Sequence, residues 1–486
     1  MSGSGTPRER NWAAGLAEWR ALLGTGRVDG TAHGLAEAGR CTFPGAPPPV
    51  CVLWPADRAE VAACLRIAHR WSLRVHPVST GRNWGYGSAC PPSSPAALMR
   101  LAGLDRIVDW DDRLGLVTVE PGVTFGALAA FLSARGSRWW PPATGAGPDV
   151  SVLGNALQRG LGRGPYRTIA DTTAGLEAVL ADGRTVRLAG GPGPSAQGFF
   201  LQGGPGVVTA LTLALEPAPE YHQHVLFRVR QGGEGTLARA VDAARELLRR
   251  HGAGLTVDLL NRHRTGAGAG ERSRPPDVLT GAWSGLAEIW ADGPDALAML
   301  RDRLLSGLSA AAGHWQLDPP GRGVPAPAGR DGLACAYRYK EGGLPDGVRP
   351  DPDRDGCGVL WFAPTIPMTG EEAARTVTLI ERTVSAHGLE PSMSLRLGRR
   401  LLHCVTGLFW DRADEATESA ATACHRRLED LCGRLGVHPY RPVLGRLPQG
   451  AVHPGTRRLL TELTGALDPN GVLTVTTYGT YGEEAR

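Results

Sequence analysis

Hydrophobic and polar residues near the start of the chain follow first the short period of a strand and then the longer period of a helix. An apolar run at Val50–Leu53 is followed by a segment with Val61, Leu65 and Ala68 on one helical face, and a second apolar run ends at Val78. These periods predict a strand, a helix and a strand in succession.

The same kinds of pattern continue further along the chain. They predict more strands, a helix from about Phe125, and a hairpin closed at Asp182-Gly183. Short strands and helices that alternate up to about residue 216 indicate an α+β domain. A longer helix at Leu237–Arg250 and isolated strands then indicate a second domain.

The length of the chain supports more than one domain, because 486 residues are too many for one ordinary core. The predicted division is 1–216, 217–435 and a C-terminal segment, 436–486. Two stretches rich in glycine and proline, 264–277 and 317–332, predict flexible surface loops. The tail LDPNGVLTVTTYG predicts a helix end followed by a short strand.

Composition excludes several classes of function. A formal net charge of +4 is too balanced for a nucleic-acid surface. The nine cysteines are scattered and never spaced CxxC, which predicts neither disulfides nor a zinc site. The acidic run DPDRD at 351–355 predicts a solvated loop, so no metal site is expected. With no apolar signal core at the N-terminus and no run of membrane-spanning length, we expect no membrane partner and a cytoplasmic location.

The run HPVSTGRNWGYGSAC, from His76 to Cys90, carries the most specific chemistry. Its glycines let the main chain approach a ligand and take φ > 0, so that successive N–H groups can bind phosphate oxygens. Hydroxyl, amide and guanidinium donors lie between them: Ser79, Thr80, Arg82, Asn83 and Ser88. The run matches neither the P-loop nor the nicotinamide fingerprint. A pyrophosphate-binding loop and a tight turn without a ligand both remain open on this pattern alone.

The loop resembles the pyrophosphate loop of the vanillyl-alcohol oxidase/p-cresol methylhydroxylase flavoprotein family, whose hallmark is PxSxGRNxGYG. The segments VTVEPGVTFGAL, GPDVSVLGNALQRGLGRGPY, GLEAVLADGRTVR and LQGGPGVVTALTLAL resemble further parts of that family in the same order. The resemblance implies a PCMH-type FAD-binding domain of two α+β subdomains. It also implies an α+β cap domain with an antiparallel sheet, and a C-terminal return that completes the first domain.

The resemblance further implies which residues contact FAD. The diphosphate would lie against the loop, and later glycine-containing segments would follow the cofactor. The implied residues are Ser79, Thr80, Gly81, Arg82, Asn83, Gly85, Gly87, Ser88, Pro121, Gly122, Gly154, Asn155, Gly206, Val207, Val208 and Thr209.

In phenol-oxidising members of this family, the tyrosine of the GYG triplet and a later Tyr-Arg pair hold the substrate's phenolate oxygen. Tyr86, Tyr440 and Arg441 match these positions. A guanidinium and two phenolic donors would stabilise the oxyanion and so promote loss of a hydride from the benzylic carbon. The alternative is that Tyr86 packs on the flavin and Tyr440-Arg441 is a structural pair.

One position departs from the family pattern. Relatives carry a carboxylate near flavin N5, and in GPYRTIADTT that place falls to Thr168, with Asp171 three residues later.

The leading hypothesis is an FAD-dependent oxidoreductase that acts on a para-substituted phenol by hydroxylation, oxidation or desaturation. The departure favours the alternative of a flavin enzyme acting on a non-phenolic alcohol, amine or sugar-like intermediate of secondary metabolism. A non-catalytic flavin-fold protein is a third hypothesis.

The mode of flavin attachment and the partners follow from the same resemblance. We expect non-covalent FAD, with a covalent link through His403 or Cys357 as the alternative. The expected partners are a small-molecule substrate and dioxygen or another electron acceptor. Relatives are often dimers, so a homodimer is left open.

Overall fold

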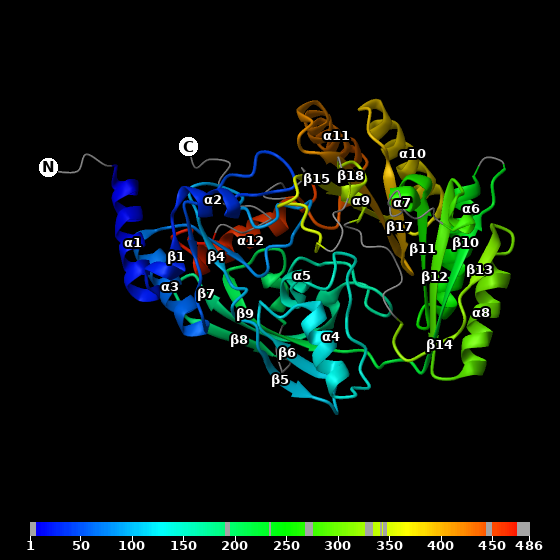
Figure 1. The fold of residues 1–486 in the computed structure, drawn as a ribbon, viewed down its shortest axis with the longest axis horizontal. Helices are drawn as coiled ribbons and strands as arrows, with labels where there is room; N and C mark the ends of the chain where they lie inside the picture. Colours follow the sequence, from blue (N-terminus) through cyan, green and yellow to red (C-terminus); the bar gives the residue numbers. More distant parts are fainter. Residues whose placement is uncertain are drawn as a thin grey trace.

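Three β-sheets organise the computed structural model (Figure 1). The structure describes residues 6–189, 195–232, 235–267, 276–325, 334–340, 343, 348–443 and 450–473. Two smaller sheets form the half of the molecule that contains the N-terminus, and the largest sheet forms the other half. The mixture of helices with parallel and antiparallel strands confirms the predicted α+β class.

The first sheet contains the predicted strand–helix–strand unit. Its order is β1-β2-β4-β3, with β2, β4 and β3 parallel. The helix between β2 and β3 begins after Asp57, whose side chain accepts from the Glu60 N–H, and it buries Val61, Leu65 and Ala68 as the period predicts. The elements are β1 (Val28–Asp29), β2 (Cys51–Leu53), β3 (Val75–Val78), β4 (Ala97–Arg100), α1 (Pro7–Leu23), α2 (Ala32–Ala38) and α3 (Arg58–Trp71).

The second sheet is antiparallel, in the order β5-β6-β9-β7-β8. The predicted turn at Asp182-Gly183 closes its β7–β8 hairpin, and Gly183 has φ 84°. The predicted helix start at Phe125 is confirmed, because Thr124 caps it. The elements are β5 (Ile107–Asp111), β6 (Leu116–Val119), β7 (Thr173–Leu180), β8 (Thr185–Ala189), β9 (Gly206–Ala214), α4 (Phe125–Ala134) and α5 (Val152–Leu157).

Within the described residues the third sheet has ten strands, and its main path runs β13-β10-β12-β11-β17-β18-β16-β19. Apolar side chains of α6, α8, α10 and α11 share one core with its strands, so these helices cover one face and leave the other toward the first half (Figure 1). The strands are β10 (Tyr221–Val229), β11 (Leu255–Asn261), β12 (Trp283–Ala291), β13 (Ala312–Leu317), β14 (Gly321–Arg322), β15 (Cys357–Phe362), β16 (Pro364–Pro367), β17 (Ser392–Leu397), β18 (Leu401–Asp411) and β19 (His438–Pro439). The helices are α6 (Thr236–His251), α7 (Arg262–Ala267), α8 (Pro294–Leu308), α9 (Ala334–Tyr337), α10 (Gly370–Ala386) and α11 (Glu415–Arg434).

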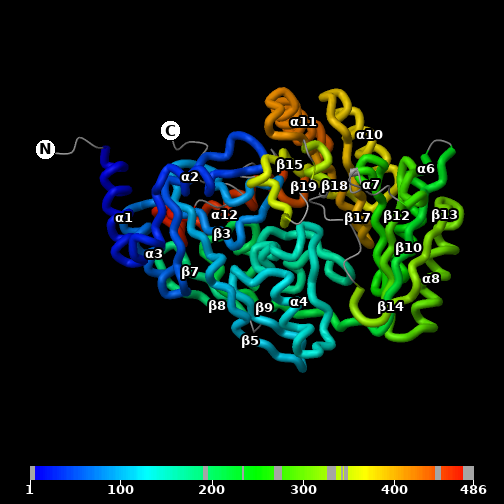
Figure 2. The backbone as a smooth tube through the Cα atoms, viewed as in Figure 1, coloured from blue at the N-terminus to red at the C-terminus, as the bar shows by residue number. Residues whose placement is uncertain are grey.

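After the third sheet the chain returns to the first half of the molecule. Helix α12 (Pro454–Leu467) lies among the N-terminal elements (Figure 2). Beyond it, Leu473 forms a parallel bridge with Val75, and the Val75 N–H donates to the Val472 carbonyl at 2.6 Å. The helix end predicted at LDPNG is confirmed, whereas the strand predicted after it falls mostly outside the described residues.

We propose that the division into 1–216, 217–435 and 436–486 describes three functional segments. Sheets one and two use strands up to Ala214, and sheet three begins at Tyr221. Strand β19 lies three residues beyond the proposed boundary at 435 and still pairs with the third sheet. No helix in the described ranges combines the length and apolar character needed to cross a membrane.

Candidate active site

A cavity of about 970 Å³ lies where the three sheets meet. Its walls come from the loop after β3, from the loops around α5, from the start of β9, from the open face of the third sheet and from the chain after β19. This volume lies in the range of about 300–1,000 Å³ that small-molecule sites in proteins occupy. The cavity is therefore the candidate active site.

The loop after β3 forms one wall with unusually bare main chain. Gly81, Gly85 and Gly87 have φ of 74°, 76° and 123°, and Ser88 also has a positive φ, 53°. Such dihedrals suit glycine and turn the chain sharply back on itself. The N–H groups of Tyr86 and Ser88 donate to the Asn83 carbonyl, and the Gly85 N–H donates to Thr42 Oγ1 at 2.8 Å. Their amides are thus used within the protein, which leaves the amides earlier in the loop for a ligand.

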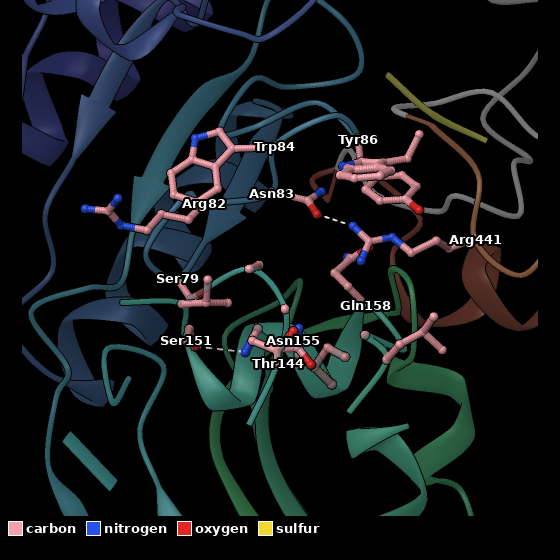
Figure 3. A pocket seen from close by; sticks show the side chains of 18 of the residues that line it. Ser79, Arg82, Asn83, Trp84, Tyr86, Thr144, Ser151, Asn155, Gln158 and Arg441 are labelled. Atoms are coloured by element: carbon pink, nitrogen blue, oxygen red, sulfur yellow. Dashed lines mark hydrogen bonds between the residues drawn. The ribbon is translucent and has the colours of Figure 1, made fainter. Parts of the chain in front are cut away.

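The opposite wall is built around α5. The Ser151 hydroxyl donates to the Pro121 carbonyl at 2.6 Å and accepts from the Gly154 N–H at 2.9 Å (Figure 3). A Cβ on Gly154 would lie 2.2 Å from Ser79 Oγ, so the two walls meet closely only because residue 154 lacks a side chain. Asn155 Oδ1 is buried in this wall without a hydrogen-bond partner among the described residues.

The structure brings most of the predicted cofactor residues to the cavity. Those that line it are Ser79, Thr80, Gly81, Arg82, Asn83, Ser88, Pro121, Gly154, Asn155, Gly206, Val207 and Val208. Gly85, Gly87, Gly122 and Thr209 are not in its lining. The Thr209 hydroxyl lies 3.4 Å from Glu177 Oε1, outside the lining. Arg82 points away from Asn83 in Figure 3, and its Nη1 lies 3.7 Å from Asp351 Oδ2.

These features fit the flavin nucleotide that the sequence resemblance implies. The cavity borders all three sheets, and its walls include the main chain of Gly81, Gly154 and Gly206. The buried Asn155 oxygen lacks, among the described residues, the partner that a buried polar atom needs. Ser79, Thr80, Asn83 and Asn155 would supply hydrogen bonds to such a cofactor.

Tyr86 and Arg441 meet across the cavity although they are far apart in the sequence. The Arg441 guanidinium carbon lies 3.6 Å from the centroid of the Tyr86 ring, and its Nη2 donates to Asn83 Oδ1 (Figure 3). Both side chains are buried, and Tyr440 lines the same cavity. Burial and the neighbouring Tyr440 phenol raise the pKa of Tyr86 well above 10, although Arg441 opposes the shift, so Tyr86 keeps its proton and can donate it in a hydrogen bond.

Arg441 carries a charge that the described part of the chain does not neutralise. It forms no ion pair with a described residue, and its Nε is buried without a hydrogen-bond partner there. A buried guanidinium with one amide oxygen as its acceptor is well suited to bind a small oxyanion.

Thr168, the fourth predicted catalytic residue, is not in the cavity lining. It is half-buried and forms an isolated bridge with Leu161. Asp171 is exposed and does not line the cavity either. Two carboxylates among the described residues line the cavity beside the third sheet, Asp318 and Asp258 on β11, and Asp258 Oδ1 lies 3.4 Å from Arg396 Nε.

The two residues considered for a covalent flavin link also lie outside the cavity lining. His403 Nδ1 is 2.9 Å from Thr365 Oγ1, and burial together with Arg396 and Arg167 lowers the pKa of His403 to about 4. Burial raises the pKa of Cys357 to about 12, so its thiol stays protonated at neutral pH. Non-covalent attachment stays a prediction.

The acidic run at 351–355 is not the fully solvated loop that the sequence predicts. The Ser88 hydroxyl donates to Asp353 Oδ1 at 2.7 Å. Burial, with Cys41 and Asp351 nearby, raises the pKa of Asp353 to about 8, despite the hydrogen bonds from Ser88 and Trp84. This burial could not be predicted from local composition, because an Asp-rich run normally lies in water.

The raised pKa of Asp353 predicts a pH dependence of cofactor binding. Below about pH 8 the carboxyl is neutral, and above it the group becomes an anion beside the predicted diphosphate loop. We therefore expect FAD affinity to fall as pH rises above 8, by at most about tenfold per pH unit. Titration of apoprotein with FAD between pH 7 and 9 measures this. Asp353→Asn should remove the dependence, and a constant affinity of the unaltered protein would contradict the prediction.

The third sheet supplies the remaining wall through side chains in register. Leu226, Leu286, Asp258 and Arg396 lie side by side on β10, β12, β11 and β17, and all four line the cavity. Further lining residues of this wall are His224, Leu260, Ser394 and Val405, with Arg163, Arg264 and Trp361 beside it. The sequence did not point to these residues. The alternation of apolar and polar positions in β11 could have indicated one water-accessible face and one buried face.

Three comparisons place this geometry among known proteins. The profile of an FAD binding domain matches residues 49–189. The chain is 30% identical to the 1'-carboxy-chondrochloren decarboxylase of Chondromyces crocatus over 94% of this chain and 95% of that protein. It is 26% identical to the 4-cresol dehydrogenase [hydroxylating] flavoprotein subunit of Pseudomonas putida, over 94% of each chain. Substrate-bound p-cresol methylhydroxylase shares the fold, with a TM-score of 0.85, 22% identity and 97% of each chain covered.

Proposed function

Because this chain belongs to the vanillyl-alcohol oxidase/p-cresol methylhydroxylase family of FAD-dependent oxidoreductases, we propose that it removes a hydride from the benzylic carbon of a para-substituted phenol. FAD, when bound, supplies the two-electron acceptor for that hydride. Dioxygen or another electron acceptor would then reoxidise the cofactor.

The cluster formed by the buried Tyr86 and Arg441 with the half-buried Tyr440 carries this proposal. A phenol oxygen placed among them would meet one permanent positive charge and two phenolic donors, away from bulk water. Such groups stabilise the phenolate more strongly than water does. The electron-rich ring can then release a benzylic hydride, and the product is a quinone methide that water or proton loss converts further.

The placement of Thr168 bears on the second half of the reaction. Since neither Thr168 nor Asp171 lines the cavity, we assign no activation of water to that segment. Asp258 lies in the lining and is a candidate for proton transfer, and its contact with Arg396 holds it on the wall of the third sheet.

Oxidative decarboxylation of a carboxylated para-substituted phenol is a second candidate. The relative with 30% identity is named a decarboxylase of a carboxy compound, and arginines line the third-sheet side of the cavity. Transfer of a benzylic hydride to oxidised FAD would leave a quinone methide. The bond from the adjacent carbon to a carboxylate would then break, releasing CO₂, and its electron pair would form the alkene and restore the phenolate.

Anaerobic mixing of the holoenzyme with 4-ethylphenol tests the common step. We expect the visible absorbance of oxidised flavin to disappear. With 4-ethylanisole, the methyl ether of the same phenol, which cannot form an oxyanion, reduction should be at least about 100-fold slower, because the Arg441 cluster has no charge to stabilise.

Equal rates with the phenol and its methyl ether would show that the oxyanion is irrelevant. That result would favour a non-phenolic alcohol, amine or sugar-like substrate instead.

A further inference from the structure

Arg264 lies at the edge of the cavity, where the Trp361 ring separates it from the loop after β3. It lies in α7, directly after β11, where its N–H donates to Asn261 Oδ1 at 3.0 Å. Its guanidinium carbon is 5.2 Å from the centroid of the Trp361 ring, and both residues line the cavity. The main-chain N–H of Trp361 in turn donates to the Gly85 carbonyl at 3.3 Å.

This location differs from the sequence-based prediction. The glycine-rich stretch from residue 264 onward predicts a surface loop, but its first four residues complete a helix that turns Arg264 toward the cavity. The rest of the stretch up to residue 275 falls outside the described residues.

The charge of Arg264 has no counterpart in the described part of the structure. Its guanidinium forms no ion pair with a described residue, and its Nη1 is buried without a hydrogen-bond partner there. By contrast, Arg396 lies 3.4 Å from Asp258 and donates to the Gly162 carbonyl at 2.7 Å. Burying part of a guanidinium without a partner costs free energy, which a bound anion would recover.

Other cationic groups nearby strengthen the positive potential. Arg163 and Arg396 line the same part of the cavity. Burial lowers the pKa of Arg163, and the nearby positive charges of Arg396 and Arg264 lower it further, so the three guanidinium groups influence one another.

The acidic groups on this side do not cancel that charge. Asp258 faces Arg396, and Asp318 lies 3.7 Å from His224 Nδ1 with half of its side chain exposed. Glu288, which is paired in register with His224, is buried, and burial raises its pKa toward the neutral form.

We propose that Arg264 binds a carboxylate on the para substituent of the phenolic substrate. One unpaired guanidinium balances one negative charge, and its planar donors match the two oxygens of a carboxylate. The inference rests on the proposed function, since Arg441 would hold the phenol oxygen of the same molecule while Arg264 holds its other end. The substrate would then be a phenol with an acidic side chain.

Isothermal titration of the holoenzyme with 3-(4-hydroxyphenyl)propanoate and with the corresponding amide tests this under anaerobic conditions. The two probes differ in charge and hardly in shape. We expect the acid to bind about 10- to 100-fold more tightly than the amide, as hydrogen bonds between charged groups predict. Arg264→Gln should reduce that ratio to about one, and Arg264→Lys should restore part of it because the positive charge returns.

Arg262→Gln is the matched control, because Arg262 lies exposed on the same helix and should leave the ratio unchanged. An acid-to-amide ratio that is the same in the unaltered protein and in Arg264→Gln would overturn the proposal. So would an Arg264→Gln variant whose flavin midpoint potential shifts while the ratio stays constant, since Arg264 would then act on the cofactor.

Flavin reduction by the same two probes separates this inference from the proposed function. If neither probe reduces the flavin but the acid still binds Arg264-dependently, the proposed reaction fails and the carboxylate site stands. If both probes reduce it at equal apparent affinity, the reaction stands and the carboxylate site fails.

Discussion

Replacing Arg441 with glutamine is expected to lower kcat/KM for 4-ethylphenol by about 10²- to 10³-fold, the usual cost of losing one donor to a developing oxyanion. The variant removes the buried cation that lies 3.6 Å from the Tyr86 ring, and the two tyrosines cannot replace its charge. FAD should stay bound, because the glycine loop and the α5 wall are unchanged. Steady-state kinetics and the visible flavin spectrum of the purified variant measure both effects.

Two further variants sharpen this result. Arg441→Lys keeps the charge but loses the planar guanidinium whose Nη2 donates to Asn83, so it should recover part of the activity. Arg458→Gln changes an exposed arginine on α12 that pairs with Glu462, and its activity should be that of the unaltered protein. A fully active Arg441→Gln protein would leave Tyr440-Arg441 as a structural pair only.

Replacing Gly122 with alanine should destabilise the cofactor-binding half and reduce its FAD content. The new Cβ would lie 2.2 Å from the Ala102 carbonyl oxygen, and backbone there cannot turn aside as a side chain would. Overpacking of this kind costs about 1–3 kcal/mol. Since the Pro121 carbonyl accepts from Ser151, a displaced loop would also move the α5 wall and Asn155.

The measurements are the thermal midpoint and the ratio of visible to ultraviolet absorbance of purified protein. Gly103→Ala is the control, because a Cβ at that nearby exposed position meets no atom within 4 Å. If Gly122→Ala keeps both its thermal midpoint and its full FAD content, the close approach at this loop is not required for cofactor binding.

The sequence predicts the first half of the molecule well because its signals are local. Helix α3 has an N-cap and an apolar stripe, and the β7–β8 turn has the Asp-Gly pair that a tight hairpin prefers. The glycine-rich loop after β3 could be predicted for the same reason, since its positive φ values require particular residues at adjacent positions.

Features that depend on distant contacts were harder to predict. Asn83 and Arg441 are 358 positions apart, and the sequence did not link them. Only the resemblance to a known family linked Arg441 with Tyr86 in the same loop. Arg264 and Asp353 both sit in stretches whose composition predicts exposed loops, and tertiary packing buries part of each. Local pattern cannot show such burial, because it depends on which segment of the chain packs above.

The leucines on the cavity side of the third sheet have a consequence for changing which substrates the protein accepts. Leu226, Leu260 and Leu286 project into the cavity from paired central strands, whereas Tyr86 and Arg441 belong to segments outside those strands. A small combinatorial library at these three leucines should therefore shift the size and shape of tolerated side groups while the phenol anchor persists. Such a separation makes the scaffold a practical starting point for directed evolution toward bulkier aromatic compounds.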